Sequence, residues 1–599
     1  MEMPQKALED ITKSVIERSH ATRQAYLQRI AKARGKIQRK DLSCVSLAHS
    51  YASLPDHIKT RIKDNDKPNY AIISAYNDVV SAHQPFKHYP DWIKETLLKH
   101  NAFAQFAGGV PAMCDGITQG YEGMELNLFS RDVIAMSTSI ALSHNIFDGA
   151  FYLGVCDKIV PGLLIGALSF GHLPAIFVPS GPMTSGLANV QKAEVRELFA
   201  RGKVSREILL ESEMKFHHSP GTCTFYGTAN SNQVVVELMG LHLPNSAFIN
   251  PNTSLRKALV HEAATLMATK TPKPIGEIVS EKSVVNAMVG LMATGGSTNL
   301  TIHLIAIARA AGIIINWDDF NAISNITPLL TKMYPNGEAD VNQFEASGGL
   351  ALVVRELLNA GLLHEDCDTI VGPGLQAYTK NPFLIDGKVV YREGVQVSQD
   401  TGIIRGVDRP FAPNGGLKIL TGNIGRSVIK VSALKEEHLV VQAPAIIFES
   451  QQDLIDRFNN KELQRDFIAV LPYQSPRANG MPELHQFTPI LSSLQNQGFK
   501  VALITDGRVP GGAGRVPSAI HVTPEALLGG GIAKIRDGDM LLLDAKKGIL
   551  QALVDEKEWE TRAPSEPLMR EVFGSGRELF CGFRLLASNT ETGAGSFGV

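Results

Sequence analysis

Residues 131–181, RDVIAMSTSIALSHNIFDGAFYLGVCDKIVPGLLIGALSFGHLPAIFVPSG, decide the fold class of this chain. Within them, residues 131–145 and 160–172 are typical of helices, whereas 149–158 and 174–181 are apolar runs typical of strands. Such an alternation predicts a parallel or mixed sheet covered by helices. We therefore expect this part of the chain to have an α/β fold.

The sequence on either side of this segment predicts two further kinds of structure. Apolar residues recur at helical spacing between residues 5 and 35, which predicts an N-terminal helix. Runs of β-forming residues follow a composition shift near residue 385 and predict a β-rich, barrel-like C-terminal domain. The expected division is a helical segment at 1–68, an α/β region with the binding sites at 69–385, a β-rich domain at 386–585 and a flexible tail at 586–599.

Composition and charge exclude several classes of function. The chain has 599 residues, and its 58 Lys and Arg nearly balance its 60 Asp and Glu, so there is no electrostatic footprint for nucleic acid. The N-terminus is acidic and lacks the apolar core of a signal peptide. The most apolar stretch, 163–181, is interrupted by Gly, His and Pro and is not typical of a membrane span. We expect a cytoplasmic enzyme.

Six cysteines are too few for a disulfide framework in a chain of this length, and no CxxC pair is present. Their ordinary interpretation is as small buried apolar residues. Cys156 differs because Asp157 and Lys158 follow it at the carboxyl end of a predicted strand, where open α/β sheets bind ligands. The alternative there is a solvated Asp–Lys pair.

Two other cysteines lie in segments that suit a metal cluster. Cys223 is surrounded by Gly, Thr, Ser and Asn in residues 221–233, which offer donors to the sulfurs of an iron–sulfur cluster. Cys114 and Asp115 lie together in the glycine-rich segment 108–124, where Asp115 could bind a divalent metal. The alternatives are a polar turn before a helix and an ordinary Asp-Gly turn.

The C-terminal half contributes an acidic residue and a glycine-rich loop. Glu449 ends an apolar run, a position where a lone Glu is more often a solvated strand end than a ligand. Residues 507–514 contain four glycines and are flanked by basic side chains, which suits close approach of the backbone to an anion. A flexible loop is the alternative.

In order and over almost the whole chain, these segments resemble the dihydroxy-acid dehydratase/6-phosphogluconate dehydratase family, and most of all its sugar-acid branch. The segments that carry the resemblance are SAYNDVVSAHQPF (74–86), GGVPAMCDG (108–116), SHNIFDGAFYLGVCDKIVPG (143–162), FVPSGPM (177–183), PGTCTFYGTAN (220–230), ATGGSTN (293–299), FESQ (448–451), ANGMPELH (478–485) and PSAIHVTPEA (517–526).

The resemblance implies an iron–sulfur cluster, expected to be of the [4Fe-4S] type. The ligating cysteines of the family match Cys156 and Cys223. The branched-chain enzymes have a further cysteine where this chain has Tyr76, whereas the sugar-acid branch has Cys114 beside a metal-binding Asp. Cys114 is therefore the expected third ligand.

The resemblance also implies a divalent cation, Mg²⁺ or Mn²⁺. Its ligands match Asp115, Asp157 and Glu449, and Lys158 matches a lysine that is carbamylated in some members. A cation at the substrate carboxylate would stabilise the charge formed on proton removal, and an iron without a protein thiolate would act on the departing hydroxyl.

The implied reaction is the Entner–Doudoroff dehydration of 6-phospho-D-gluconate to 2-dehydro-3-deoxy-6-phospho-D-gluconate, carried out by a homodimer. Candidates for the substrate phosphate are Arg508, Arg515, Arg477 and Lys87. Another sugar acid or a branched-chain dihydroxy acid is the alternative substrate, and dependence on phosphate would separate them.

One position departs from the family. Members usually carry a serine, thought to be the base, directly after an Asp-Gly-Arg-hydrophobic tetrapeptide, and here that position is Pro510. Proline has neither a hydroxyl nor a backbone donor. A catalytically impaired paralogue is therefore an alternative, and Lys158 and the position of Pro510 are the expected catalytic positions.

Overall fold

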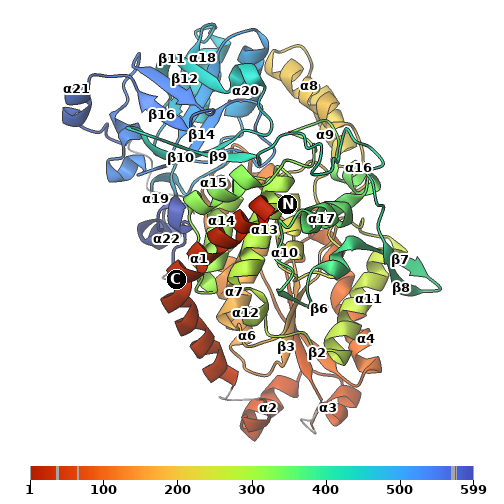
Figure 1. Ribbon diagram of the computed structural model, residues 1–599. Coiled ribbons are helices and arrows are strands. Elements are labelled where there is room, and N and C mark those ends of the chain that lie inside the picture. The colour runs from red at the N-terminus through yellow and green to blue at the C-terminus, as the bar shows by residue number, and fades with distance from the viewer. Residues whose placement is uncertain (1, 35–38, 64–66, 568–573, 575, 598–599) are drawn as a thin grey trace.

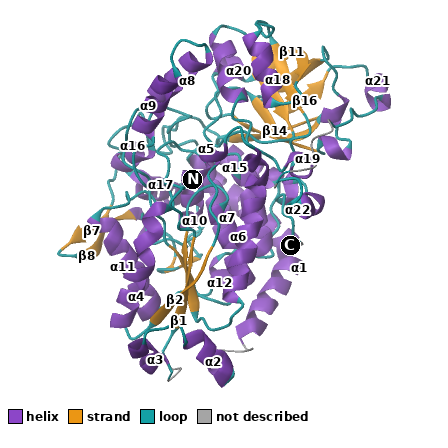
Figure 2. Ribbon diagram, turned by 180° about the vertical axis from the view of Figure 1, so that it is seen from behind, coloured by secondary structure: helices purple, strands orange, loops and turns teal. Residues whose placement is uncertain are grey.

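The computed structural model describes residues 2–34, 39–63, 67–567, 574 and 576–597. A parallel sheet wrapped by helices forms one part, and a closed β-barrel forms the other (Figure 1). Seen from behind and coloured by secondary structure, the strands form two main groups, with helices around the lower one (Figure 2). Within the described ranges, no helix combines the length and apolar character that a membrane span requires.

The first sheet has four parallel strands in the order β2-β1-β3-β4. Its central strands are fully buried runs of apolar residues, as expected for a sheet covered on both faces. The α/β prediction is confirmed. The strands are β1 (Asn69–Ser74), β2 (Phe103–Gly109), β3 (Gly149–Leu153) and β4 (Ala175–Phe177).

Helices α6 and α7 cover this sheet and pack closely on each other because glycines line their contact. A Cβ on Gly162 would lie 2.6 Å from the carbonyl oxygen of Arg131, and one on Gly166 would lie 2.6 Å from Thr138 Cβ. The larger helices of this region are α1 (Glu2–Arg34), α4 (Tyr89–Lys99), α6 (Asn127–Leu142), α7 (Ile159–Ser169), α8 (Asn189–Ala200), α9 (Arg206–Phe216), α10 (Thr228–Leu238), α11 (Ser254–Thr269), α13 (Glu281–Ala293), α14 (Leu300–Ala310), α15 (Trp317–Ile326) and α17 (Gly349–Asn359). The shorter ones are α2 (Cys44–Tyr51), α3 (Asp56–Ile62), α5 (Asp115–Thr118), α12 (Ile275–Ile278) and α16 (Val341–Ala346).

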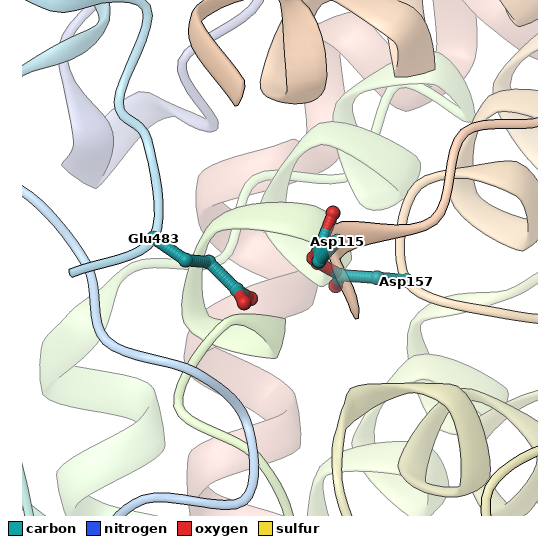
Figure 3. A group of neighbouring side chains, drawn as sticks. All are labelled: Asp115, Asp157 and Glu483. Carbon is teal, nitrogen blue, oxygen red and sulfur yellow. The ribbon is translucent and has the colours of Figure 1, made fainter. Parts of the chain in front are cut away.

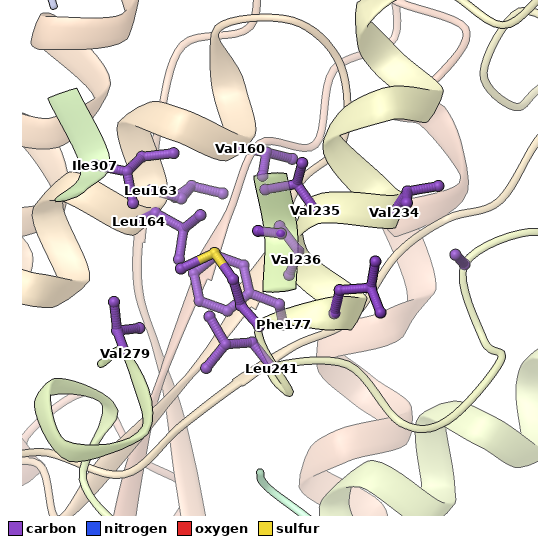
Figure 4. Close-up of a cluster of buried hydrophobic side chains, with 14 of the residues drawn as sticks. Val160, Leu163, Leu164, Phe177, Val234, Val235, Val236, Leu241, Val279 and Ile307 are labelled. Carbon is purple, nitrogen blue, oxygen red and sulfur yellow. The ribbon is translucent and has the colours of Figure 1, made fainter. Parts of the chain in front are cut away.

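The main core lies between the sheet and these helices. Figure 4 shows Leu163 and Leu164 of α7, Phe177 of β4 and Val235 and Val236 of α10 meeting there. All five side chains are buried. This core holds the start of α7 and the start of α10 in fixed positions relative to the sheet.

The second part is a closed barrel of eight strands, in the order β10-β14-β13-β12-β11-β15-β16-β9. The β11–β12, β12–β13, β13–β14 and β16–β9 pairs are parallel, whereas the β9–β10, β10–β14, β11–β15 and β15–β16 pairs are antiparallel. The β-rich, barrel-like prediction is confirmed. The strands are β9 (Leu417–Gly422), β10 (Gly425–Lys430), β11 (Val440–Ile447), β12 (Phe467–Leu471), β13 (Val501–Thr505), β14 (Ser518–Thr523), β15 (Met540–Asp544) and β16 (Ile549–Ala552), and the helices of this part are α18 (Gln451–Asn459), α19 (Pro476–Asn479), α20 (Phe487–Asn496), α21 (Glu556–Thr561) and α22 (Cys581–Leu586).

Between the two parts, residues 380–393 form a hairpin of β7 (Lys380–Ile385) and β8 (Lys388–Glu393), which packs on α11. The first barrel strand begins later, at Leu417. Helix α8 reaches the barrel side and packs on α20 (Figure 1). The division of the chain into four parts remains a proposal.

The expectation of a flexible tail after residue 585 is wrong for the described residues up to 597. Ala587 and Ala594 are fully buried, and a 3-10 helix spans Thr590–Thr592. Ser596 donates from its backbone N–H to Asp132 of α6 at 2.8 Å. The small residues that suggested a loose end allow this segment to fit tightly against α6 and α14.

Candidate active site

Three residues that follow β3 form the base of the site. The strand ends at Leu153, and the chain turns through Cys156, which has a positive φ of 73°, before α7 begins at Ile159. Asn232 of α10 donates to the carbonyl oxygens of Cys156 and Asp157 at 2.9 and 3.0 Å. These bonds hold the turn at the carboxyl end of the sheet, where ligands bind in α/β folds.

Asp115 follows β2, which is separated from β3 by β1 in the sheet, and it begins the short helix α5. The fully buried Lys158 amine donates to Asp115 Oδ2 at 2.5 Å and to Asp157 Oδ2 at 2.6 Å. The sequence placed all three in the site, and the structure brings their charged atoms into contact.

The barrel part of the chain adds one acidic and one basic side chain to the site. Glu483 lies on the loop between α19 and α20, and Arg508 follows β13. Arg508 Nη1 lies 2.8 Å from Glu483 Oε1 and 3.0 Å from Asp157 Oδ2. Figure 3 shows Asp115 and Asp157 beside each other, with the carboxylate of Glu483 directed toward them. The site therefore lies where the two parts of the molecule meet.

The carboxylates of this group are not equivalent in charge. Burial opposes ionisation of Asp157, but Lys158, His303 and Arg508 more than offset it, so its pKa lies well below the usual range. Burial and the nearby Asp115 raise the pKa of Glu483 to about 8. The two cations therefore do not fully compensate the three carboxylates.

A hard divalent cation fits this group. One carboxylate oxygen from each of Asp115, Asp157 and Glu483 lies within 4.8 Å of the others. Asp157 Oδ1 is buried, and its neighbour among the described residues is His303 Nε2 at 3.3 Å, without the geometry of a hydrogen bond. Carboxylate oxygens are the ligands that Mg²⁺ and Mn²⁺ prefer, and a cation here would also favour the ionised form of Glu483.

Glu449, predicted as the third carboxylate, does not belong to this group. It is exposed, and its backbone N–H donates to Asp453 of α18 at 3.1 Å. Its position after β11 is an ordinary strand end. Glu483 takes the expected place, and the sequence contained a signal for it, because ANGMPELH, residues 478–485, is one of the segments that carry the resemblance.

Three cysteines converge beside the carboxylates. Cys114 and Cys156 directly precede Asp115 and Asp157 in the chain. Burial and the charges of Cys114 and Cys223 raise the pKa of Cys156 well above its usual range, and burial and Cys114 raise that of Cys223 to about 12. Thiols so close to one another, none in a disulfide, fit an iron–sulfur cluster with three protein ligands.

The other cysteines lie elsewhere. Cys44 and Cys581 are exposed at the starts of α2 and α22, and Cys367 is buried near His364. Tyr76, at the position of the branched-chain cysteine, donates to Asp78 at 2.6 Å.

The glycine-rich loop lies on the segment that follows Cys223. A Cβ on Gly511 would be 2.3 Å from Thr228 Oγ1, so the loop packs directly on the start of α10. Pro510 is partly exposed, and its carbonyl oxygen accepts from Ala513 N–H at 2.8 Å. The hydroxyls of Thr228 and Ser297 lie beside Gly511 and are hydrogen-bonded to each other at 2.8 Å.

The four predicted phosphate-binding residues do not form one site. Arg508 is engaged by carboxylates, which corrects its assignment to the phosphate. Arg477 donates to the carbonyl oxygen of Ala587 at 2.6 Å, and Lys87 is exposed. The guanidinium of Arg515 lies over the Tyr334 ring, 4.9 Å from its centroid. Among the described residues, no hydrogen bond or ion pair joins any two of these four side chains.

Comparison with known proteins supplies the context for this site. Residues 67–378 match a family model described as dihydroxy-acid/6-phosphogluconate dehydratase N-terminal, and residues 402–594 match the corresponding C-terminal model. The chain is 57% identical to the phosphogluconate dehydratase of Helicobacter pylori strain J99 over the full length of both, and 54% identical to that of Escherichia coli K12 over 98% of each. It is also 32% identical to the dihydroxy-acid dehydratase of Aquifex aeolicus, over 86% of this chain and 91% of the relative.

Proposed function

The chain belongs to the dihydroxy-acid/6-phosphogluconate dehydratase family, and from this premise we propose that it converts 6-phospho-D-gluconate to 2-dehydro-3-deoxy-6-phospho-D-gluconate, the dehydration step of the Entner–Doudoroff pathway. The assignment of the substrate rests on one observation. The chain is 51–57% identical, over at least 97% of its length, to relatives named phosphogluconate dehydratase. The dihydroxy-acid dehydratase of Aquifex aeolicus is more distant, at 32%.

The reaction requires a proton to leave C2 and hydroxide to leave C3, after which the enol becomes the 2-keto acid. We assign Asp115, Asp157 and Glu483 to a divalent cation, Mg²⁺ or Mn²⁺, and Cys114, Cys156 and Cys223 to a cluster of the [4Fe-4S] type. When bound, these groups supply Lewis acidity toward the substrate carboxylate and the departing hydroxyl.

The side chains of the protein orient these groups. Lys158 and Arg508 hold Asp115, Asp157 and Glu483 in place through charge-assisted hydrogen bonds. Because both cations are already paired with carboxylates, they act as positioning residues in this proposal. Neither is free to accept the C2 proton.

An impaired paralogue is not favoured by any observation. The carboxylates and thiols are brought together despite Pro510, and the full-length relatives are named phosphogluconate dehydratase. We infer that another group serves as base in this chain. A homodimer in the cytoplasm is part of the same proposal.

The proposal is tested by anaerobic assay of the cluster-reconstituted protein, following formation of the 2-keto-3-deoxy acid. The substrates to compare are 6-phosphogluconate, gluconate and 2,3-dihydroxy-3-methylbutanoate. We expect the highest kcat/KM with 6-phosphogluconate. A preference for 2,3-dihydroxy-3-methylbutanoate would assign the chain to the branched-chain reaction instead.

A further inference from the structure

Lys430, the last residue of β10, carries a buried amine without a partner. The residue is 6% exposed, and Nζ makes no hydrogen bond within the described part of the chain. Burial lowers the pKa of Lys430 to about 7. Buried lysines are normally paired with a carboxylate, because an isolated ammonium loses its hydration.

Among the residues that the structure describes, no carboxylate acts on Lys430. Burial is the sole cause of its lowered pKa, whereas Lys158 contacts two aspartates. An amine with three unused donors and no internal counter-ion is suited to an anion that arrives from outside the protein. Such an anion would provide the hydrogen bonds and the charge that Lys430 lacks.

The glycine-rich loop lies against Lys430. Gly514 has a φ of 151°, and a Cβ at this residue would be 3.1 Å from Lys430 Cδ. In the described structure, the backbone N–H groups of Gly511, Gly512 and Gly514 donate no hydrogen bond. Unpaired N–H groups beside a cation form the type of concave site that binds phosphate.

A second cation adjoins the same glycine. Arg515 follows Gly514 and lies over the ring of Tyr334. Ser432, two residues after Lys430, donates to Asn336, two residues after Tyr334, at 3.1 Å. The segment that carries Lys430 therefore lies beside the segment that carries Tyr334. Because Arg515 lies over Tyr334, both cations are placed around Gly514.

The loop connects this place with the carboxylate group, because Arg508, its second residue, contacts Asp157 and Glu483. A substrate with an anionic group at each end needs two sites, one for its carboxylate and one for its phosphate. Resting on the proposed function, we propose that Lys430, with Arg515 and the free N–H groups of the glycine-rich loop, binds the terminal phosphate of the substrate.

Kinetics with two substrates test this assignment in the cluster-containing protein. Lys430→Met should raise KM for 6-phosphogluconate by about 10- to 100-fold, the range of a lost charged hydrogen bond, and leave kcat nearly unchanged. The kcat/KM for gluconate, which has no phosphate, should not change. Lys430→Arg should retain much of the affinity. Lys418→Met is the matched control, because Lys418 lies on the adjacent strand β9 and donates to the Lys546 carbonyl.

Calorimetry with inorganic phosphate provides a readout that does not depend on turnover. Wild type should bind phosphate with uptake of protons near neutral pH, because the anion favours the charged form of Lys430. Titrations in buffers of different ionisation enthalpy measure this uptake. Lys430→Met should lose it, and Lys418→Met should keep it.

The outcomes separate this inference from the proposed function. If Lys430→Met shows unchanged phosphate binding and unchanged KM, the inference is overturned. The proposed function still stands in that case, provided that the protein turns over 6-phosphogluconate. A fall in kcat with KM unchanged would also overturn it and would assign the amine to proton transfer. Absence of turnover in wild type, with phosphate binding that depends on Lys430, would overturn the function alone. If Lys430→Met does not fold by circular dichroism, Arg515→Gln serves in both assays, and unchanged phosphate binding and KM in Arg515→Gln overturn the inference.

Discussion

Glu483 and Arg508 are paired twice: their backbones form a parallel bridge, and Arg508 Nη1 lies 2.8 Å from Glu483 Oε1. This double pairing fixes an acidic side chain on a loop that belongs to no strand. It directs the Glu483 carboxylate toward Asp115 and Asp157, across the boundary between the barrel and the α/β region.

Glu483→Gln should therefore release the divalent cation. The variant keeps the shape of the side chain but removes one anionic ligand, and we expect kcat/KM to fall by more than the about 10- to 100-fold typical of losing an outer-shell partner. Metal analysis after anaerobic gel filtration measures the loss. Glu449→Gln is the control, with full metal content and activity. Metal loss in the control variant instead would restore the original assignment of Glu449.

Cys156→Ser and Cys223→Ser should each abolish the visible absorbance of the anaerobically purified protein, because each removes a thiolate from the proposed cluster. Cys114→Ser tests the third ligand separately. The triple variant at Cys44, Cys367 and Cys581 should retain iron, sulfide and colour. Bleaching of that triple variant would contradict the ligand assignment.

Pro510→Ala should leave kcat within about 10-fold of wild type, because a proline ring transfers no proton. A general acid–base group would be expected to cost about 10²–10⁴-fold on removal. Rapid-quench assays over a range of pH give the comparison. A loss as large as 10²-fold would show that the ring has an essential positioning role. A large gain in Pro510→Ser would show that the hydroxyl of the family improves on the present base.

Acid should destabilise the folded chain through His83. Burial lowers the pKa of this histidine to about 4, and its Nε2 lies 3.1 Å from the carbonyl oxygen of Val155, next to Cys156. The unfolded chain takes up a proton near pH 6.5 and the folded chain does not. The contribution of neutral His83 to the free energy of unfolding is therefore fully present above about pH 6.5 and is lost as pH falls toward 4.

Within that window, the free energy of unfolding should fall by up to about 1.4 kcal/mol per pH unit because of His83. His83→Gln should reduce this dependence of the unfolding free energy on pH. Chemical denaturation at several pH values between 4 and 7.5 measures it. His57, an exposed histidine on α3, supplies the control variant His57→Gln. An identical slope in wild type and His83→Gln would contradict the assignment.

The sheet and the barrel could be predicted from the sequence, as could the meeting of Asp115, Asp157 and Lys158 in the candidate site, because these depend on local patterns. Buried apolar runs predict β1 and β3, and ligands that follow parallel strands must meet at one edge. The predicted strand at 149–158 was too long, because the chain leaves the sheet after Leu153 and Cys156 adopts a positive φ. Such a turn depends on the distant Asn232, which no local pattern reveals.

The choice between Glu449 and Glu483 also depended on tertiary structure. Both lie close to barrel elements, and the family resemblance matched Glu449 to the third ligand, although a lone Glu at a strand end is more often solvated. Only the pairing with Arg508 distinguishes Glu483. Lys430 was missed for a similar reason, since an amine on a β-forming run has no sequence signal until the glycine-rich loop covers it.

The docking of the C-terminal segment has a consequence for how the chain is made. Ser596 and the carbonyl oxygens of Gly593 and Ala594 bind Asp132 and Arg131 of α6, which supports α7 and the turn at Cys156. The ribosome makes these residues after α6, α7 and Cys156. The α/β region therefore reaches its final packing only once residues 593–596 have been made, and a cluster delivered earlier in translation would meet an unfinished site.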